Sequence, residues 1–404
     1  MKIFSLRENL RSMFIPVSSH WRAVDGLRAL SVIWMILLHS LFFMAEFLPQ
    51  KQLEPFLEKG WVSLLGKGHF GVDIFFVISG FLIASLLFRE HREQAGLSIK
   101  RFYGRRFLRL FPVYAICLFL CAILIKINAA QWWTNVLYVN NFIPFEKQFM
   151  GWAWSLAVEW QFYLLFPPFL LFFYKLPKYR LTALFILLGL AFVVQGVAAA
   201  SSKIILPIPF HPHFGESPQI FGHFFDTVYD KPYNRFGALV CGVIVAYFLT
   251  YHREQVEAWS RSTFQKIGFL VSILVFVLIL KAPDTSLPQG LWDPFWSWFY
   301  LTTHRYFFSM ALSFILLFIL GGSPQSWLNR FLSLRFWYPV AQISYSAYLM
   351  HPIVILAIYF LGLDPQKNVQ DSFLIFLPFI FLVTFFLSAI LYLFVERPGM
   401  NLRK

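Results

Sequence analysis

The sequence predicts an all-α protein, a polytopic bundle of about ten transmembrane helices with both termini in the cytoplasm. Hydrophobic residues make up 58% of the 404 positions, and charged residues make up only 13%. A water-soluble chain of this length could not bury so much apolar surface. The apolar residues gather in long runs and the basic residues gather in alternate connections. These two patterns predict the number of helices and their direction.

An apolar run of about 18 residues or more can cross the hydrocarbon of a bilayer as a helix. Such runs define the ten expected spans, at roughly 23–45, 69–88, 108–127, 151–174, 181–201, 235–251, 265–281, 301–320, 338–361 and 372–395.

The basic residues are distributed unequally between the two sides of the predicted membrane. If residue 1 lies in the cytoplasm, the cytoplasmic connections carry a clear excess of Lys and Arg, whereas the opposite connections carry the two signs equally. This positive-inside asymmetry places both termini in the cytoplasm. It also accounts for the formal net charge of +14 without a nucleic-acid partner.

A single membrane domain is expected over residues 23–398, because we find no internal repeat and no appended soluble domain. Residues 1–22 show no cleavable signal peptide. They form either a basic amphipathic segment on the membrane surface or a disordered tail. Residues 399–404 form a short cytoplasmic tail.

The cysteine and histidine patterns argue against a structural metal or a disulfide framework. Cys117, Cys121 and Cys241 all fall inside predicted helices. His211, His213 and His223 follow the fifth span, but without a nearby carboxylate pattern they favour an ordinary exposed loop. We therefore expect no metal site.

Charged groups inside the spans are costly and mark functional candidates. The first span contains Arg28 near its cytoplasmic end and His39 toward the other end. Eleven residues of helix place both side chains on one face, with a rise of about 16 Å between them. The alternatives are that Arg28 snorkels to lipid phosphates and that His39 only hydrogen-bonds within the bundle.

Two carboxylates are candidate partners of that histidine. Glu159 lies at nearly the same predicted depth as His39, and Asp73 lies about one turn from the outer end of the second span. A carboxylate beside an imidazole orients the ring and raises its basicity. A structural ion pair for Glu159 and a helix cap for Asp73 remain the alternatives. The glycines Gly71 and Gly80 favour close helix packing over phosphate binding.

A polar stripe on the ninth span can line a cavity. Ser344, Tyr348 and His351 share one helical face, and Pro352 predicts a local kink. Ser155, on the same face of the fourth span as Glu159, is a further candidate lining residue. Interhelical hydrogen bonding without chemistry explains the stripe equally well.

The connection between spans two and three is strongly basic. Arg106 and Arg109, three residues apart at a helix start, suit recognition of phosphate or carboxylate, with Arg105 beside them. Ordinary positive-inside anchoring is the favoured alternative. On the far side, residues 131–145 mix Trp with Asn. This composition suits sugar binding but favours an interfacial aromatic belt.

Taken in order, these residues resemble the membrane acyltransferase-3 family, the O-acyltransferases of surface polysaccharides and related acceptors. The similarity runs from about Trp21 to Pro398. The matching pieces are RAVDGLRAL with the following His39, GVDIFFVISGFLI, RRFLRLFP, WSLAVEWQFYLLFP, ISYSAYLMHPI and VERP. The resemblance implies a ten-helix bundle that uses acetyl-CoA or a related acyl-CoA as co-substrate. It also implies that Arg28 and His39 are required for activity and that Arg106 and Arg109 bind the acyl donor.

The resulting hypothesis is an integral membrane O-acyltransferase of the bacterial inner membrane. The donor nucleotide binds Arg105, Arg106 and Arg109, and the thioester arm passes Arg28 toward His39. His39, oriented by Glu159 or Asp73, acts on a hydroxyl of a glycan or glycolipid acceptor, either as a base or as an acyl-imidazole nucleophile.

Besides acyl-CoA and the acceptor, membrane lipid is the expected partner, and the chain acts alone or with a separate periplasmic partner. The alternative function is a secondary transporter or flippase, which the absence of paired halves disfavours. A membrane scaffold would need none of these intramembrane charges.

Overall fold

The structure is a computed structural model that describes residues 4–16, 21–94, 96–125, 128–206, 208, 218–281, 293–322 and 326–402. Within these ranges the elements are all helical, with no strand. Ten of the helices are long and apolar enough to cross a membrane. They are α2 (Arg22–Met44), α5 (Phe70–Gln94), α6 (Ile99–Leu124), α8 (Trp154–Phe173), α9 (Arg180–Ser202), α11 (Pro232–Tyr251), α13 (Thr263–Lys281), α14 (Pro294–Gly321), α16 (Trp337–Gly362) and α17 (Val369–Leu391).

The ten predicted spans are confirmed, with differences at helix ends. Helix α6 begins at Ile99 rather than at residue 108, because Lys and Arg are good helix formers and continue the helix beyond its apolar part. The basic residues of this connection therefore lie on a helix. Helix α16 runs through Pro352 without interruption.

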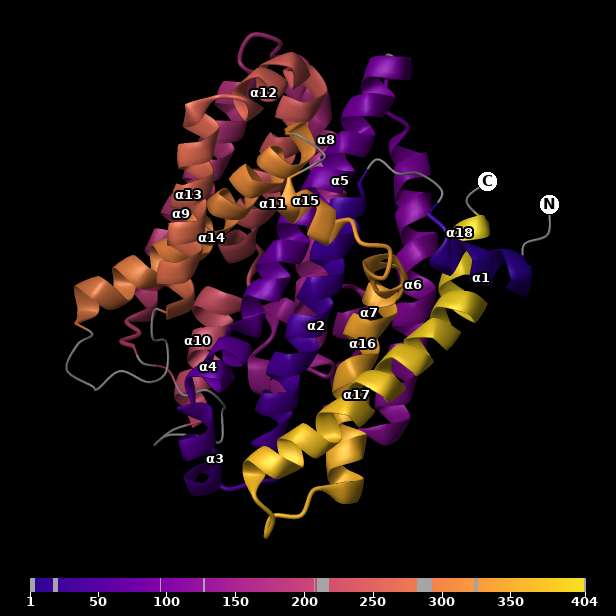
Figure 1. Cartoon of the computed structure of the whole chain (residues 1–404), viewed down its shortest axis with the longest axis vertical. Helices are drawn as coiled ribbons and strands as arrows, with labels where there is room; N and C mark the ends of the chain where they lie inside the picture. Colours follow the sequence, from indigo (N-terminus) through magenta and orange to yellow (C-terminus); the bar gives the residue numbers. More distant parts are fainter. Residues whose placement is uncertain are drawn as a thin grey trace.

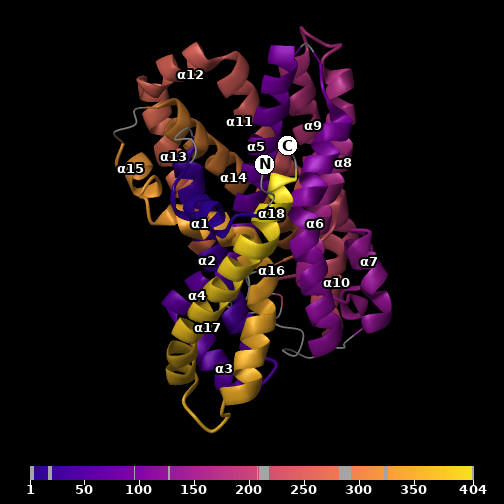
Figure 2. The same cartoon turned by 90° about the vertical axis from the view of Figure 1, so that its right-hand side faces the viewer.

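Short helices connect the spans or flank the first and last of them. They are α1 (Leu6–Phe14), α3 (Gln50–Leu57), α4 (Gly60–Gly66), α7 (Trp132–Val136), α10 (Pro218–Phe224), α12 (Arg253–Ser260), α15 (Trp327–Leu332) and α18 (Arg397–Asn401), with π-helical turns at Phe225–Tyr229 and Tyr392–Glu396. Figures 1 and 2 show α3 at the lower end, α10 in the lower half and α12 at the upper end. This arrangement is the one expected if successive spans cross in alternate directions.

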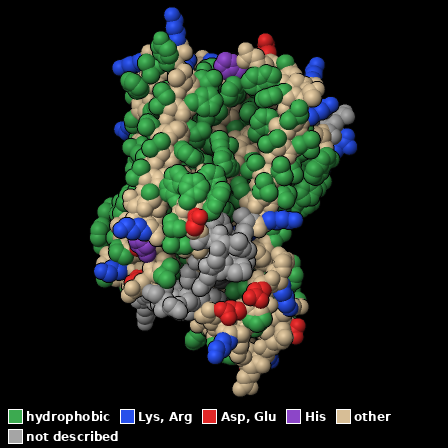
Figure 3. All heavy atoms as spheres, turned by 90° about the vertical axis from the view of Figure 1, so that its left-hand side faces the viewer, with side chains coloured by type: hydrophobic (Ala, Val, Ile, Leu, Met, Phe, Trp, Pro, Cys, Tyr) green, Lys and Arg blue, Asp and Glu red, His purple; other side chains and the backbone are tan. Residues whose placement is uncertain are grey.

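Helices α5 and α2 form the centre of the bundle. Helix α5 packs along α11 and α2, and α2 packs along α16, which α17 covers from outside. On the other flank α9 and α14 contact α11, and α13 contacts α14. The side chains of α9 and α13 are mostly exposed although both helices are strongly apolar. Figure 3 shows hydrophobic side chains over a broad band of this face, with charged groups gathered toward its margins. A lipid-facing surface has this pattern.

The N-terminal segment forms a helix packed on the bundle. Ser5 caps α1, and the amide of Asn9 donates to the carbonyl of Leu393 at 2.8 Å. Leu6, Leu10 and Phe14 stay exposed on the outer face of α1. Of the two readings of residues 1–22, the described part fits an amphipathic surface helix. The first and last described helices, α1 and α18, both contact the π-helical turn at Tyr392–Glu396, and Figure 2 shows them close together.

Helices α5 and α11 approach unusually closely because a glycine stands at each side of the contact. An added Cβ at Gly80 would overlap the backbone of Leu239, and one at Gly242 would overlap the backbone of Val77. The packing role expected for Gly80 is confirmed. Backbone-to-backbone contact of this kind fixes the distance between the two helices.

A buried ion triad joins α5, α11 and α14. The carboxylate of Asp73 contacts Arg235 at 3.2 Å and Arg305 at 2.5 Å, one oxygen for each guanidinium. Asp73 and Arg235 are each only 1% exposed. Arg235 also lies over the rings of Trp154 and Tyr229, at 4.8 and 4.3 Å from their centroids. The second positive charge is thus accommodated partly by aromatic faces.

We predict that Gly242→Ala destabilises the bundle by about 1–3 kcal/mol, because the new methyl group must push α5 and α11 apart. Gly104→Ala is the matched control. An added Cβ at Gly104 meets nothing within 4 Å, so this change should be neutral or stabilising by up to about 1 kcal/mol. Thermal unfolding in detergent measures both, and equal midpoints for the two variants would contradict the close contact.

We predict that Asp73→Asn destabilises the protein by about 3–5 kcal/mol, because it leaves two buried guanidinium groups without their counter-charge. Glu257→Gln serves as control, since the Arg253–Glu257 pair is exposed and its loss should cost at most about 0.5 kcal/mol. Chemical denaturation of both variants makes the comparison. An Asp73→Asn protein of normal stability that lacks catalysis would instead assign Asp73 to chemistry.

Candidate functional site

A cavity of about 110 Å³ with charged and polar groups in a largely apolar wall lies between α2, α5, α6, α8 and α16. The polar and charged residues of its lining are Arg28, Ser79, Arg106, Arg109, Ser155, Glu159, Tyr163, Ser344, Tyr345 and Tyr348. The remaining lining is apolar, contributed mainly by α5. The cavity therefore combines three guanidinium groups and one carboxylate inside an apolar bundle, where charges interact more strongly than in water.

The basic side of the cavity comes from α2 and α6. Arg28 donates from Nη2 to Ser344 Oγ of α16 at 3.0 Å. Arg106 lies over the rings of Phe102 and Tyr163, at 5.5 and 5.7 Å from their centroids. Arg109 lines the same cavity one helical turn further along α6. Arg106 and Arg109 therefore share one face of α6.

Arg105 lies elsewhere. It is exposed and does not contribute to the cavity lining. The three-residue spacing keeps Arg106 and Arg109 on one face of α6, whereas the adjacent position points about 100° away. A direct contact between Arg105 and a ligand in this cavity is therefore excluded by its position, although the side chain stays near the same end of α6.

Glu159 is held by two hydroxyl groups. Ser79 and Tyr163 both donate to its Oε1, and these two hydroxyls lie 3.1 Å apart. The expected pairing of Glu159 with His39 does not appear among the contacts of the described residues. Counting residues along a helix estimates depth but not rotation, and the rotation of α8 turns Glu159 toward α5 and the cavity instead.

The structure pairs His39 with a second imidazole. His39 Nδ1 and His351 Nε2 are 2.6 Å apart, and the two rings are nearly parallel at 4.8 Å between centroids. His39 is partly exposed, whereas His351 is fully buried on α16. Since Arg28 and His39 both contact α16, their predicted common face is confirmed.

The stripe on α16 is divided between the cavity and this histidine pair. Tyr348 donates to the carbonyl of Trp152 at 2.8 Å, so the hydroxyl of Ser155, 2.5 Å away, donates to Tyr348. Ser344, Tyr348 and Ser155 line the cavity as expected. His351 does not line it, because the side chain is buried against His39.

Asp73 does not take part in the histidine site. Both of its carboxylate oxygens are engaged by Arg235 and Arg305 in the ion triad. Neither arginine was predicted as a partner of Asp73, because each stands in the first turns of a predicted span, where it could as well belong to the preceding connection. The available signal for this triad was an acidic residue within one span together with a basic residue at the start of each of two later spans.

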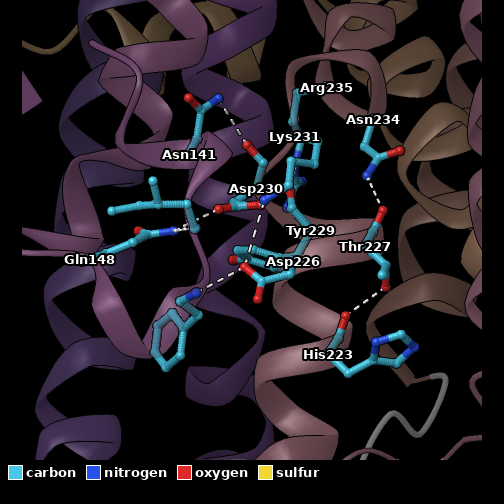
Figure 4. A network of polar contacts seen from close by, with 12 residues as sticks. Asn141, Gln148, His223, Asp226, Thr227, Tyr229, Asp230, Lys231, Asn234 and Arg235 are labelled. Atoms are coloured by element: carbon cyan, nitrogen blue, oxygen red, sulfur yellow. Dashed lines mark hydrogen bonds and ion pairs between the residues drawn. The ribbon is translucent and has the colours of Figure 1, made fainter. Parts of the chain in front are cut away.

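A second polar network joins the connection between α6 and α8 to the π-helical turn at Phe225–Tyr229 and the start of α11, as Figure 4 shows. Asp230 accepts hydrogen bonds from Lys231 at 2.8 Å and from Gln148 at 2.9 Å, and Asp226 accepts from the backbone of Phe145 at 2.9 Å. Burial raises the pKa of Asp230 to about 6, against the opposing effect of Lys231. The network ties residues 128–153 to the turn that carries Tyr229, and so supports the aromatic contact of Arg235.

The connections between α6 and α8 and between α9 and α11 show how their aromatic, amide and histidine residues are used. Trp132 is 55% exposed, whereas Asn135 and Asn141 are fully buried and hydrogen-bonded to other parts of the protein. This arrangement fits the aromatic-belt interpretation. His223 donates from Nε2 to the carbonyl of Ser202. The other two histidines of the HxH pattern, His211 and His213, lie outside the described residues.

Two polar sites with complementary chemistry, the cationic cavity and the histidine pair, thus lie along α2 and α16. The cationic cavity can bind an anion, and the partly exposed His39 can accept a proton or act as a nucleophile. Arg28 and His39 are related by the rigid geometry of one helix, so the two sites keep a constant separation of about 16 Å.

Comparison with known proteins places this chain in a protein family. The chain is 28% identical over 401 residues to a putative O-acetyltransferase of Staphylococcus aureus (strain COL), covering 93% of this chain and 56% of that protein. It is 28% identical over 423 residues to the O-acetyltransferase OatA of Staphylococcus aureus (strain NCTC 8325 / PS 47), covering 97% and 58%.

A third relative is the nose resistant to fluoxetine protein 6 of Caenorhabditis elegans, 27% identical over 386 residues, covering 82% of this chain and 45% of that protein. The chain spans about half the length of these curated relatives. No solved structure matches. The family described as Acyltransferase domain matches residues 21–393. This chain, a multi-pass membrane protein, therefore belongs to the acyltransferase-3 family.

Proposed function

We propose that the protein is an O-acyltransferase that moves an acyl group, specifically acetyl, from cytoplasmic acyl-CoA to a hydroxyl of a glycan or glycolipid at the extracytoplasmic side. The observation that carries the proposal is the α2–α16 interface. It places Arg28 at a cationic cavity and His39 beside His351 further along the same helix. Two relatives, one named an O-acetyltransferase and one a putative O-acetyltransferase, support the reaction class. The bacterial plasma membrane is the proposed location.

The donor end of the site is assigned to Arg28, Arg106 and Arg109. Guanidinium groups match phosphate geometry and stay charged in an apolar bundle. The one carboxylate of the cavity, Glu159, is already engaged by two hydroxyls. The three guanidinium groups are therefore available to the phosphates of acyl-CoA. The basic surplus of the connections near this end supports a cytoplasmic orientation of the cavity.

His39 carries the transfer in this proposal. Its imidazole takes the proton of the acceptor hydroxyl, whose oxygen attacks the thioester carbonyl carbon. The carbon–sulfur bond breaks, and the coenzyme A thiolate leaves and receives the proton from His39. The products are an ester and a free thiol, and the histidine returns to its starting state. In the alternative route a nitrogen of His39 attacks the thioester carbonyl carbon, the carbon–sulfur bond breaks and coenzyme A leaves as the thiolate. The acceptor hydroxyl then attacks the acyl-imidazole, the imidazole of His39 is released, and the hydroxyl proton goes to the thiolate.

We predict that His39→Ala inserts and folds but loses transfer by roughly 10²–10⁴-fold, the usual contribution of a general base. The test uses purified full-length protein in nanodiscs, radiolabelled acetyl-CoA and a panel of peptidoglycan fragments, lipopolysaccharide and exopolysaccharide oligosaccharides. His252→Ala, in a connection remote from α16, is the control and should keep full activity. Undiminished acylation by the His39→Ala protein would refute the assignment. Rapid quench without acceptor distinguishes the routes, since only the second leaves label on the protein.

We predict that Arg106→Ala weakens acetyl-CoA binding at least tenfold, because a charge-assisted hydrogen bond contributes about 1.5–3 kcal/mol. Arg105→Ala is the matched control, since it removes the same charge from the neighbouring exposed position of α6. Equilibrium titration with acetyl-CoA measures both affinities. Equal, small losses in the two variants would show that both arginines only anchor the helix to lipid.

A further inference from the structure

The proton positions in the histidine pair follow from its hydrogen bonds. His351 Nδ1 lies 3.0 Å from the carbonyl oxygen of Ala347 and also interacts with the backbone carbonyl of Tyr348. The latter carbonyl lacks its usual helical donor, because the residue four positions on is Pro352, which has no N–H. A carbonyl oxygen only accepts, so Nδ1 of His351 must carry the proton.

That proton position determines the state of the neighbouring ring. A neutral imidazole carries a single N–H, so Nε2 of His351 is an acceptor. The 2.6 Å contact then requires Nδ1 of His39 to donate to it. The remaining nitrogen of His39, Nε2, is therefore unprotonated, with its lone pair directed away from the pair.

We infer that His351 is a positioning residue that holds His39 in the Nδ1–H tautomer and leaves Nε2 of His39 free to act as base or nucleophile. The inference rests on the proposed function and deepens it. An unpaired His39 would divide between two tautomers and several ring orientations, and only one tautomer has the reactive lone pair at Nε2. The hydrogen bond to His351 selects that state before the substrates arrive.

The same bond assists the reaction itself. When Nε2 of His39 takes the proton of the acceptor hydroxyl, the ring becomes an imidazolium with two N–H groups. The bond from Nδ1–H to His351 Nε2 is then charge-assisted and strengthens. His351 neither gains nor loses a proton in this step. The partner of a catalytic histidine is commonly a carboxylate, but here Glu159 and Asp73 are engaged by other groups.

Two amide substitutions separate positioning from general packing. In His351→Gln the amide oxygen can reach the place of the imidazole Nε2 and accept from His39. In His351→Asn the shorter amide reaches only the place of Nδ1, so the contact with Ala347 is kept and the acceptor for His39 is lost. Both substituted side chains are polar and uncharged, so the two variants differ mainly in which neighbour the amide can reach.

The experiment uses full-length protein in nanodiscs with labelled acetyl-CoA and the acceptor panel described above. His351→Gln should keep kcat within roughly tenfold of wild type, and His351→Asn should lose roughly 100-fold. KM for acetyl-CoA should stay within about twofold in both. Wild-type kcat in the folded Asn variant, or equal losses in two folded variants, would overturn the inference.

A second measurement keeps the inference testable without activity. Solid-state NMR of ¹⁵N-histidine-labelled wild-type protein, with His39 assigned by comparison with His39→Gln, should show His39 as the Nδ1–H tautomer. An Nε2–H tautomer would overturn the inference whatever the activity. A wild-type protein with the Nδ1–H tautomer that transfers no acyl group would instead count against the proposed function alone.

Discussion

The structure depends on one constraint: a charge inside a membrane-spanning bundle must find its partner within the protein. Asp73 meets this constraint with two arginines from α11 and α14, and Arg28 meets it with a serine of α16. Because water is absent from the bilayer core, each pairing lowers the cost of holding a charged group inside the bundle. Each pairing also fixes the rotation of the helices that it joins, so the polar residues determine how the apolar surfaces face one another.

The candidate site is a consequence of the rotation that these contacts impose on α2 and α16. Two polar contacts, Arg28 with Ser344 and His39 with His351, cross the same interface at different depths. Glycine at positions such as Gly80 and Gly242 lets α5 and α11 pack closely behind this interface. The result is a rigid frame, and the positions of a cationic cavity and a reactive imidazole along one helix follow from that frame.

The hydroxyl groups around the cavity help to make it selective for an anionic ligand. Glu159 is held by Ser79 and Tyr163, and Tyr348 is held between Ser155 and the carbonyl of Trp152. These neutral groups satisfy the acidic and phenolic groups without adding counter-charge to the cavity. The guanidinium groups of Arg106 and Arg109 therefore keep their positive potential for an anionic ligand.

Helical periodicity alone was sufficient to predict several parts of the site. The eleven-residue interval between Arg28 and His39 placed both on one face, and the three-residue interval between Arg106 and Arg109 did the same, because these relations are internal to single helices. The same reasoning failed for Glu159 and Asp73. Their partners come from other helices, and neither depth nor period says how one helix is rotated against another.

The sequence by itself determined that this is a helical membrane protein, how many times it crosses, and which polar residues share a helix face. Hydropathy and local geometry are sufficient for those conclusions, because they depend on residues close together in the chain. Only the tertiary structure decided that His39 meets His351 rather than a carboxylate, and that Asp73 is neutralised by Arg235 and Arg305. Those pairings join residues far apart in the chain, and the packing of whole helices selects among many partners of similar chemistry.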